Sequence, residues 1–189
     1  NGDGTWTLDM DADKTITAMF TQDEYSLTIF SSPEGKGTVA TDPDQETYLY
    51  GQVITLTAVP EPGWSLTQWT GPSAGDAVDN GDGTWLLTMT GNKELTANFT
   101  EDLYDVTVTV LGSGTVSNTP GNPYLYLELA TLTPAPIGDA IFAGWSGPDA
   151  GDLMDIGDGT WRLRMTGNKE VTAMFAATRL YVPLVVNNH

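Results

Sequence analysis

The chain contains no cysteine and only one histidine, which is the last residue, His189. Without cysteine there is neither a disulfide nor a thiolate, and redox chemistry indicates no cellular compartment. Serine and aspartate occur together only in turn-like stretches, so a nucleophile with a positioned base cannot be assembled. Pairs of carboxylates are common because the chain is acidic, and they do not indicate a glycosidase. We therefore expect no catalytic residues and no enzymatic activity.

Basic residues are also scarce, with 7 lysines and arginines against 25 aspartates and glutamates and a formal net charge of −18. Such a charge repels phosphate groups, which excludes nucleic acid and anionic membranes as partners. Long apolar runs are missing as well, and none approaches the ~20 residues that a membrane span requires. We expect neither nucleic-acid binding nor membrane insertion.

What the chain does contain is a long internal repeat. The stretch Asn80–Thr100, NGDGTWLLTMTGNKELTANFT, recurs as NGDGTWTLDMDADKTITAMFT from Asn1 and as IGDGTWRLRMTGNKEVTAMFA from Ile156. Equivalent tryptophans in the three copies are separated by 79 and then 76 residues. Because the chain opens inside one copy, we expect it to be a portion of a longer or processed protein.

Each copy alternates apolar and variable positions with period two, which is typical of strands with one buried face. The residues between the two alternating segments, Gly91-Asn92-Lys93 and Gly167-Asn168-Lys169, tolerate positive φ. We therefore predict a β-hairpin in every copy. The apolar positions are Trp6, Leu8, Met10, Ile16, Ala18 and Phe20; Trp85, Leu87, Met89, Leu95, Ala97 and Phe99; and Trp161, Leu163, Met165, Val171, Ala173 and Phe175.

The repeat also predicts the domain organisation. Residues 1–22 hold the terminal hairpin of an incomplete repeat, residues 23–100 and 101–176 are complete β repeats, and residues 177–189 form an apolar tail. No window has a sustained helical period, so we predict an all-β protein with six strands per complete repeat. The joint at Glu101 to Leu103 is short and lacks glycine and proline, which favours a stiff rod.

A set of short motifs runs in the same order through both complete repeats. In the first repeat they are Gly35-Lys36-Gly37-Thr38-Val39, Tyr48-Leu49-Tyr50-Gly51, Leu56 to Gly63, Trp69 to Gly71 and Lys93 to Phe99. This order resembles the divergent internalin B-repeat family of bacterial surface proteins. The resemblance implies small β-grasp-like or sandwich-like modules in a stalk or adhesive segment outside the cell, and it implies no catalytic residues. The second repeat departs from the pattern, with Leu127-Glu128 in place of Tyr50-Gly51 and Ile137-Gly138-Asp139 in place of Glu61-Pro62-Gly63.

Acidic loops before the recurring tryptophans could bind calcium, because carboxylates are the ligands that Ca²⁺ prefers. The pattern is incomplete, since an EF-hand-like loop ending at Gly83 would place Val78 at its first ligand position and has no closing glutamate. An Asp-Gly turn without metal is the favoured interpretation, and we expect no cofactor. The calcium candidates are Asp76, Asp79 and Asp82 in the first repeat and Asp149, Asp152, Asp155 and Asp158 in the second.

Aromatic side chains suggest a second kind of site, because indole faces can stack on sugars. Trp69 and Trp145 recur beside turns, where they can equally fill the core, and we favour the core. Trp64 has Ala140 as its counterpart, so the fold does not require it, and we expect it to be the most exposed aromatic and the candidate ligand-binding residue. Recurring lysines, Lys14, Lys93 and Lys169, could form amide crosslinks, but we favour exposed lysines in the hairpins.

The two ends of the chain suggest self-association. The tail is an apolar, β-prone run, and the hairpin of residues 1–22 lacks a covering layer. We expect either that the tail of one copy adds as a strand to residues 1–22 of the next, or that it folds back onto its own second repeat. The assembly candidates are Leu180, Tyr181, Val182, Leu184, Val185 and Val186 in the tail and Trp6, Leu8, Met10, Ile16 and Phe20 in the first copy.

Together these observations predict a non-catalytic, extracellular structural or adhesive repeat segment of a bacterial surface protein or filament. Its expected partners are further repeats of the same protein or a second copy of the chain. The alternative is a carbohydrate-binding accessory module of a secreted protein, in which Trp64 and neighbouring tyrosines would line an open face.

Overall fold

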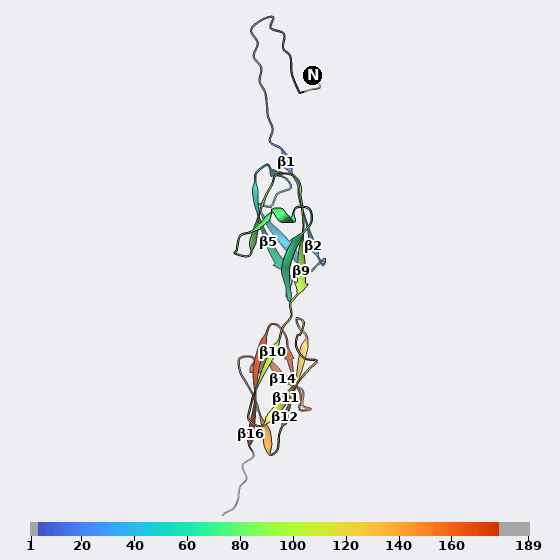
Figure 1. The fold of residues 1–189 in the computed structure, drawn as a ribbon, viewed down its shortest axis with the longest axis vertical. Coiled ribbons are helices and arrows are strands. Elements are labelled where there is room, and N and C mark those ends of the chain that lie inside the picture. The colour runs from blue at the N-terminus through green and yellow to red at the C-terminus, as the bar shows by residue number, and fades with distance from the viewer. Residues whose placement is uncertain (1–3, 178–189) are drawn as a thin grey trace, which may run out of the picture.

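The computed structural model describes residues 4–177 and consists of two β-rich modules that follow one another along the long axis of the molecule (Figure 1). The strands of the first module are β1 (Glu24–Tyr25), β2 (Leu27–Ser32), β3 (Gly37–Asp42), β4 (Tyr48–Leu49), β5 (Val53–Pro60), β6 (Trp64–Thr70), β7 (Ala77–Asp79), β8 (Thr84–Thr88) and β9 (Lys93–Glu101). Those of the second are β10 (Val106–Leu111), β11 (Gly114–Thr119), β12 (Leu129–Pro136), β13 (Ala140–Ser146), β14 (Leu153–Asp155), β15 (Trp161–Arg164) and β16 (Lys169–Ala177).

Both modules have the same topology. A three-stranded sheet has the order β2-β9-β6 in the first module and β10-β16-β13 in the second, with the first pair parallel in each case. A four-stranded antiparallel sheet has the order β3-β5-β8-β7 in the first and β11-β12-β15-β14 in the second. The only helices among residues 4–177 are the short 3₁₀ turns η1 (Ala74–Asp76) and η2 (Ala150–Asp152), so the all-β class is confirmed.

The two sheets of a module enclose one core, as the layers of a sandwich do. In the first module Ile54 and Leu56 from β5 and Leu87 from β8 pack with Leu95 from β9 of the other sheet, and all four are fully buried. The second module repeats this arrangement with Ala130, Leu132, Leu163 and Val171. The alternation predicted for the two complete copies is confirmed, because their apolar positions face these cores.

The predicted hairpin is wrong. Strand β8 pairs with β5 and β7, whereas β9 pairs with β2 and β6, so consecutive strands belong to different sheets. The chain therefore crosses from one layer to the other, and the apolar faces of β8 and β9 meet across the core instead of side by side. Neither Gly91 nor Asn92 adopts positive φ, and the Asn92 side chain instead accepts a hydrogen bond from the Ser26 amide at 3.0 Å.

Residues 4–22 form no strand, which corrects the prediction of a hairpin in the incomplete copy. The segment doubles back on itself beyond the first module (Figure 1). Its apolar positions have no second sheet to pack against, and two strands alone are barely stable in water. Trp6 is 92% exposed and Phe20 94% exposed, whereas their counterparts in the complete modules pack against a core.

Candidate functional site

The acidic loops are ordered by their own carboxylates. Asp79 accepts a hydrogen bond from the Gly81 amide at 2.8 Å, and Asp82 accepts hydrogen bonds from the Thr84 amide at 3.0 Å and the Thr84 hydroxyl at 2.6 Å. These bonds hold the pKa of Asp82 below its usual value of 3.8, with the Thr84 hydroxyl as the largest cause. The second module repeats the arrangement, with Asp155 bonded to Gly157 and Asp158 bonded to Thr160.

The remaining calcium candidates face lysines. Asp76 Oδ2 lies 2.6 Å from Lys93 Nζ, and Asp149 and Asp152 both contact Lys169 Nζ, at 3.1 and 2.7 Å. Within residues 4–177 no three carboxylate or histidine side chains form a group that could hold a metal ion. The carboxylates thus serve turns and ion pairs here, and calcium binding stays the less favoured hypothesis.

Lys93 and Lys169 are not the exposed hairpin lysines that we expected. The Lys93 side chain is only 9% exposed and that of Lys169 only 11%, because both lysines lie where the chain crosses between the sheets. Lys93 also donates a hydrogen bond to the Thr90 hydroxyl at 3.0 Å. Hydrogen bonds to Asp152 and Asp149 raise the pKa of Lys169 above its usual value of 10.5, so its ammonium form persists and does not favour an amide crosslink.

The tryptophans of the two complete modules divide into core residues and Trp64. Trp69 and Trp145 pack against the two cores, as favoured from the sequence, and the buried indole nitrogen of each has no hydrogen-bond partner among the described residues. The expectation that Trp64 is the most exposed aromatic is wrong, because Trp64 is half-buried whereas Tyr50 is 58% exposed. Lys36 Nζ lies 4.9 Å from the centre of the Trp64 ring. One face of the candidate sugar-binding indole is thus covered by a lysine, and carbohydrate binding stays a prediction.

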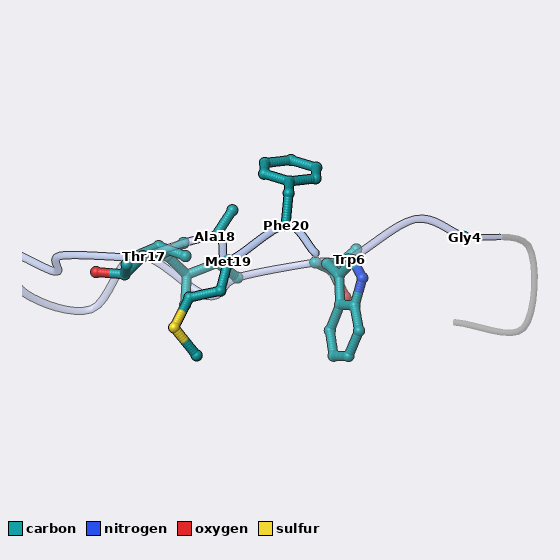
Figure 2. Close-up of a pocket in the computed structure, with 9 residues that line it drawn as sticks. Gly4, Trp6, Thr17, Ala18, Met19 and Phe20 are labelled. Atoms are coloured by element: carbon teal, nitrogen blue, oxygen red, sulfur yellow. The ribbon is translucent and has the colours of Figure 1, made fainter. Parts of the chain in front are cut away.

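The first copy of the repeat presents its apolar side chains to solvent. A hollow of about 780 Å³ lies between its two arms and is lined by Trp6, Leu8, Ile16, Ala18 and Phe20, among others. Figure 2 shows the rings of Trp6 and Phe20 pointing to opposite sides of the backbone, so the two do not cover one another. Of the assembly candidates, Leu8, Met10 and Ile16 are also exposed, and residues 180–186 lie outside the described part of the chain.

The two modules touch at a joint that the sequence pattern did not predict. Tyr126 of the second module lies against Gly63, which occupies the turn between β5 and β6 of the first. A Cβ added at Gly63 would lie 2.6 Å from Tyr126 Cγ, so only glycine fits. The Asp102 amide also donates a hydrogen bond to the Gly63 carbonyl at 2.8 Å. The recurrence of a tyrosine at positions 50 and 126 was the available signal.

A second correction concerns the alignment near this joint. The amides of Gly51 and Leu127 donate equivalent hydrogen bonds, to the carbonyls of Met89 and Met165, both at 2.7 Å. Leu127 therefore takes the place of Gly51, not of Tyr50, and it has the same positive φ, at 66° against 80°. Tyr126 is then the counterpart of Tyr50.

The geometry defines a class of protein made of tandem, sandwich-like β modules joined end to end. The model of the Divergent InlB B-repeat domain matches residues 25–103 and again residues 104–179. The chain therefore belongs to the divergent InlB B-repeat family, which is typical of bacterial surface proteins. Only repeat domains of this non-catalytic type were found, and searches of curated proteins and of solved structures gave no match. Among the described residues no helix is long and apolar enough to cross a membrane.

Proposed function

We propose that this chain is a non-catalytic spacer in an extracellular bacterial surface protein or filament, and that stacked modules hold the parts on either side at a set distance. The joint carries the proposal. Tyr126 contacts Gly63, and the Asp102 amide is bonded to the same glycine. Such contacts restrict bending more than a bare linker does, and a spacer depends on that restriction. An adhesive role would use the exposed faces of the same modules.

The stiffness of the joint can be measured directly, because the chain has no native cysteine. Spin labels at T28C and T107C, two exposed positions on β2 and β10, report the distance between the modules. We expect a narrow distance distribution for the otherwise unchanged chain. G63N keeps a residue that tolerates positive φ but adds a side chain against Tyr126, and it should broaden the distribution.

G138N is the matched control, because Gly138 also has positive φ, at 62°, but a Cβ there meets nothing within 4 Å. It should leave the distribution unchanged. A broad distribution in the unaltered chain would show that the modules swing freely and would contradict the spacer. Antibody labelling of intact producing cells tests the location separately, and labelling that requires permeabilised cells would contradict an extracellular one.

We also propose that the exposed apolar residues of the first copy support self-association, with the tail of a second copy added there as a strand. Five assembly candidates, from Trp6 to Phe20, are exposed at positions whose counterparts are core residues. The competing site for the tail lies in its own chain, where a hollow of about 280 Å³ next to Ala177 is lined by Ile137, Ala140 and Phe175. Deleting residues 178–189 should abolish any oligomer if the proposal is right. An unchanged oligomeric state, with a less stable second module, would assign the tail to its own chain.

A further inference from the structure

The joint has a preformed face on the second module. Tyr104 and Tyr126 pack together with ring centres 6.4 Å apart and ring planes at 57°. The Gly63 turn lies against Tyr126, which is half-buried as a result. The face therefore consists of a tyrosine pair, and its ligand is a turn with a glycine at positive φ, here 81°.

The first module has the same face, and it is open. Tyr25 and Tyr50 have ring centres 6.3 Å apart and ring planes at 59°, within 0.1 Å and 2° of the other pair. Tyr50 is 58% exposed, although it is the counterpart of half-buried Tyr126. Its backbone is held in place, because its amide bonds to the Asp23 carbonyl at 3.3 Å and its carbonyl accepts a bond from the Gln22 side chain at 3.1 Å. The geometry of the pair thus does not depend on a turn lying against it.

The second module does not have a matching turn between β12 and β13. The Trp64 amide bonds to the Glu61 carbonyl at 3.0 Å, and the Ala140 amide bonds to the Ile137 carbonyl at 3.3 Å, so the two turns align position by position. They differ in conformation, because positive φ falls at Gly63 in the first and at Gly138 in the second. Asp139 therefore stands where the first module has Gly63, and Ala140 stands where it has Trp64. Any side chain at this position would collide with a docked tyrosine, as the added Cβ at Gly63 shows.

We propose that the Tyr25/Tyr50 face binds the β5–β6 turn of another module of this family, one that carries glycine at the position of Gly63. Docking is directional. The tyrosine face of the first module can bind the turn of another module, but the turn of the second module cannot bind such a face, because Asp139 blocks the contact. A second unaltered copy is therefore not the ligand. The inference deepens the proposed spacer function and rests on it, since it states how further modules are added.

The contact is small, so the fraction of chains that associate through it depends on concentration. Inside the chain the two faces are linked by Glu101 to Leu103, and a short link gives an effective concentration on the order of millimolar. Between separate chains no link raises the local concentration, so we expect association only at high protein concentration. A search for it must extend to about 1 mM.

The test gives the second module the turn of the first. The triple variant G138P/D139G/A140W installs Pro62, Gly63 and Trp64 at the equivalent positions of the full chain. We expect the triple variant to form open head-to-tail oligomers, so that its average mass rises with concentration up to about 1 mM and exceeds that of the unaltered chain. Adding Y50S should return the triple variant to the average mass of the unaltered chain, because the exposed Tyr50 side chain is the face itself.

Two further variants keep the result decisive. D139G alone removes the blocking side chain with the smallest change to the fold, and it replaces the triple variant if circular dichroism shows that the latter unfolds. A triple variant carrying G63N should still associate, since only its internal joint is altered. A folded triple variant whose average mass matches that of the unaltered chain at 1 mM, or one whose additional association survives Y50S, overturns the proposal. The spin-label distances within one chain are unaffected by either outcome, so the spacer and the docking face can fail separately.

Discussion

Tyr126 lies against Gly63, and this contact joins two modules that otherwise have separate cores. The glycine is required twice, because its φ of 81° disfavours other residues and because a side chain would enter the tyrosine ring. The same tyrosine recurs as Tyr50 on the first module, where it is exposed. A repeat protein can extend itself by using one contact many times, and we propose the pair of Tyr126 and Gly63 as the pattern for that contact.

Equivalent leucines in the copies should differ greatly in their effect on stability. L87A removes a fully buried side chain and should lower the free energy of unfolding of the first module by about 2–5 kcal/mol. L8A truncates a leucine that is 44% exposed in the first copy, and it should change the same free energy of unfolding by less than about 0.5 kcal/mol. Urea unfolding followed by tryptophan fluorescence measures both. A large effect of L8A would show that residues 4–22 are packed in solution.

Gly37 should not tolerate alanine, although its backbone conformation is open to any residue. An added Cβ would lie 2.5 Å from Phe99 Cζ, in the core of the first module, and overpacking of this kind costs about 1–3 kcal/mol. G75A is the control, because a Cβ there meets nothing within 4 Å. Chemical denaturation should separate the two variants, and equal midpoints would refute the close packing of Phe99 on β3.

The two buried lysines should respond differently to loss of one carboxylate. D76N leaves Lys93 without its ion-pair partner at 2.6 Å, and we expect a loss of about 1 kcal/mol. D152N leaves Lys169 paired with Asp149 at 3.1 Å, so it should lower the free energy of unfolding by less than D76N does. Differential scanning calorimetry of the two variants tests this order. A larger effect of D152N would mean that Asp149 does not substitute for it.

Stability should fall at both extremes of pH because of the same cluster. The hydrogen bond from the Glu170 amide, more than Lys169, holds the pKa of Asp149 below its usual value of 3.8. The ionised carboxylate therefore stabilises the fold fully above pH 3.8, and this stabilisation is lost as the pH falls through the lowered pKa. Lys169 has a pKa raised above 10.5, so its contribution is complete below that pH and is lost as the pH rises through the raised pKa. Melting curves of D149N should show a weaker dependence on acid than those of the unaltered chain.

Calcium should not stabilise the modules. The loop carboxylates already accept hydrogen bonds from backbone amides, and the others face lysines, so a cation would have to replace these partners. The melting temperature should be the same in millimolar calcium and in chelator, and isothermal titration should show no heat. A melting temperature that rises in calcium, and no longer does so in D82N, would place a metal site in the loop.

The sequence alone determined which apolar side chains of the two complete repeats face a core, because a period of two in apolar side chains is a local property of a strand with one wet face. Leu87, Met89, Leu95 and Phe99 could be assigned to the core from that pattern, and the order of motifs indicated the family. Only the tertiary structure decided which strands pair, because strands that face each other across a core have the same pattern as strands that lie side by side. It also decided the burial of Lys93 and the contact of Tyr126 with Gly63, since both depend on residues that are distant along the chain.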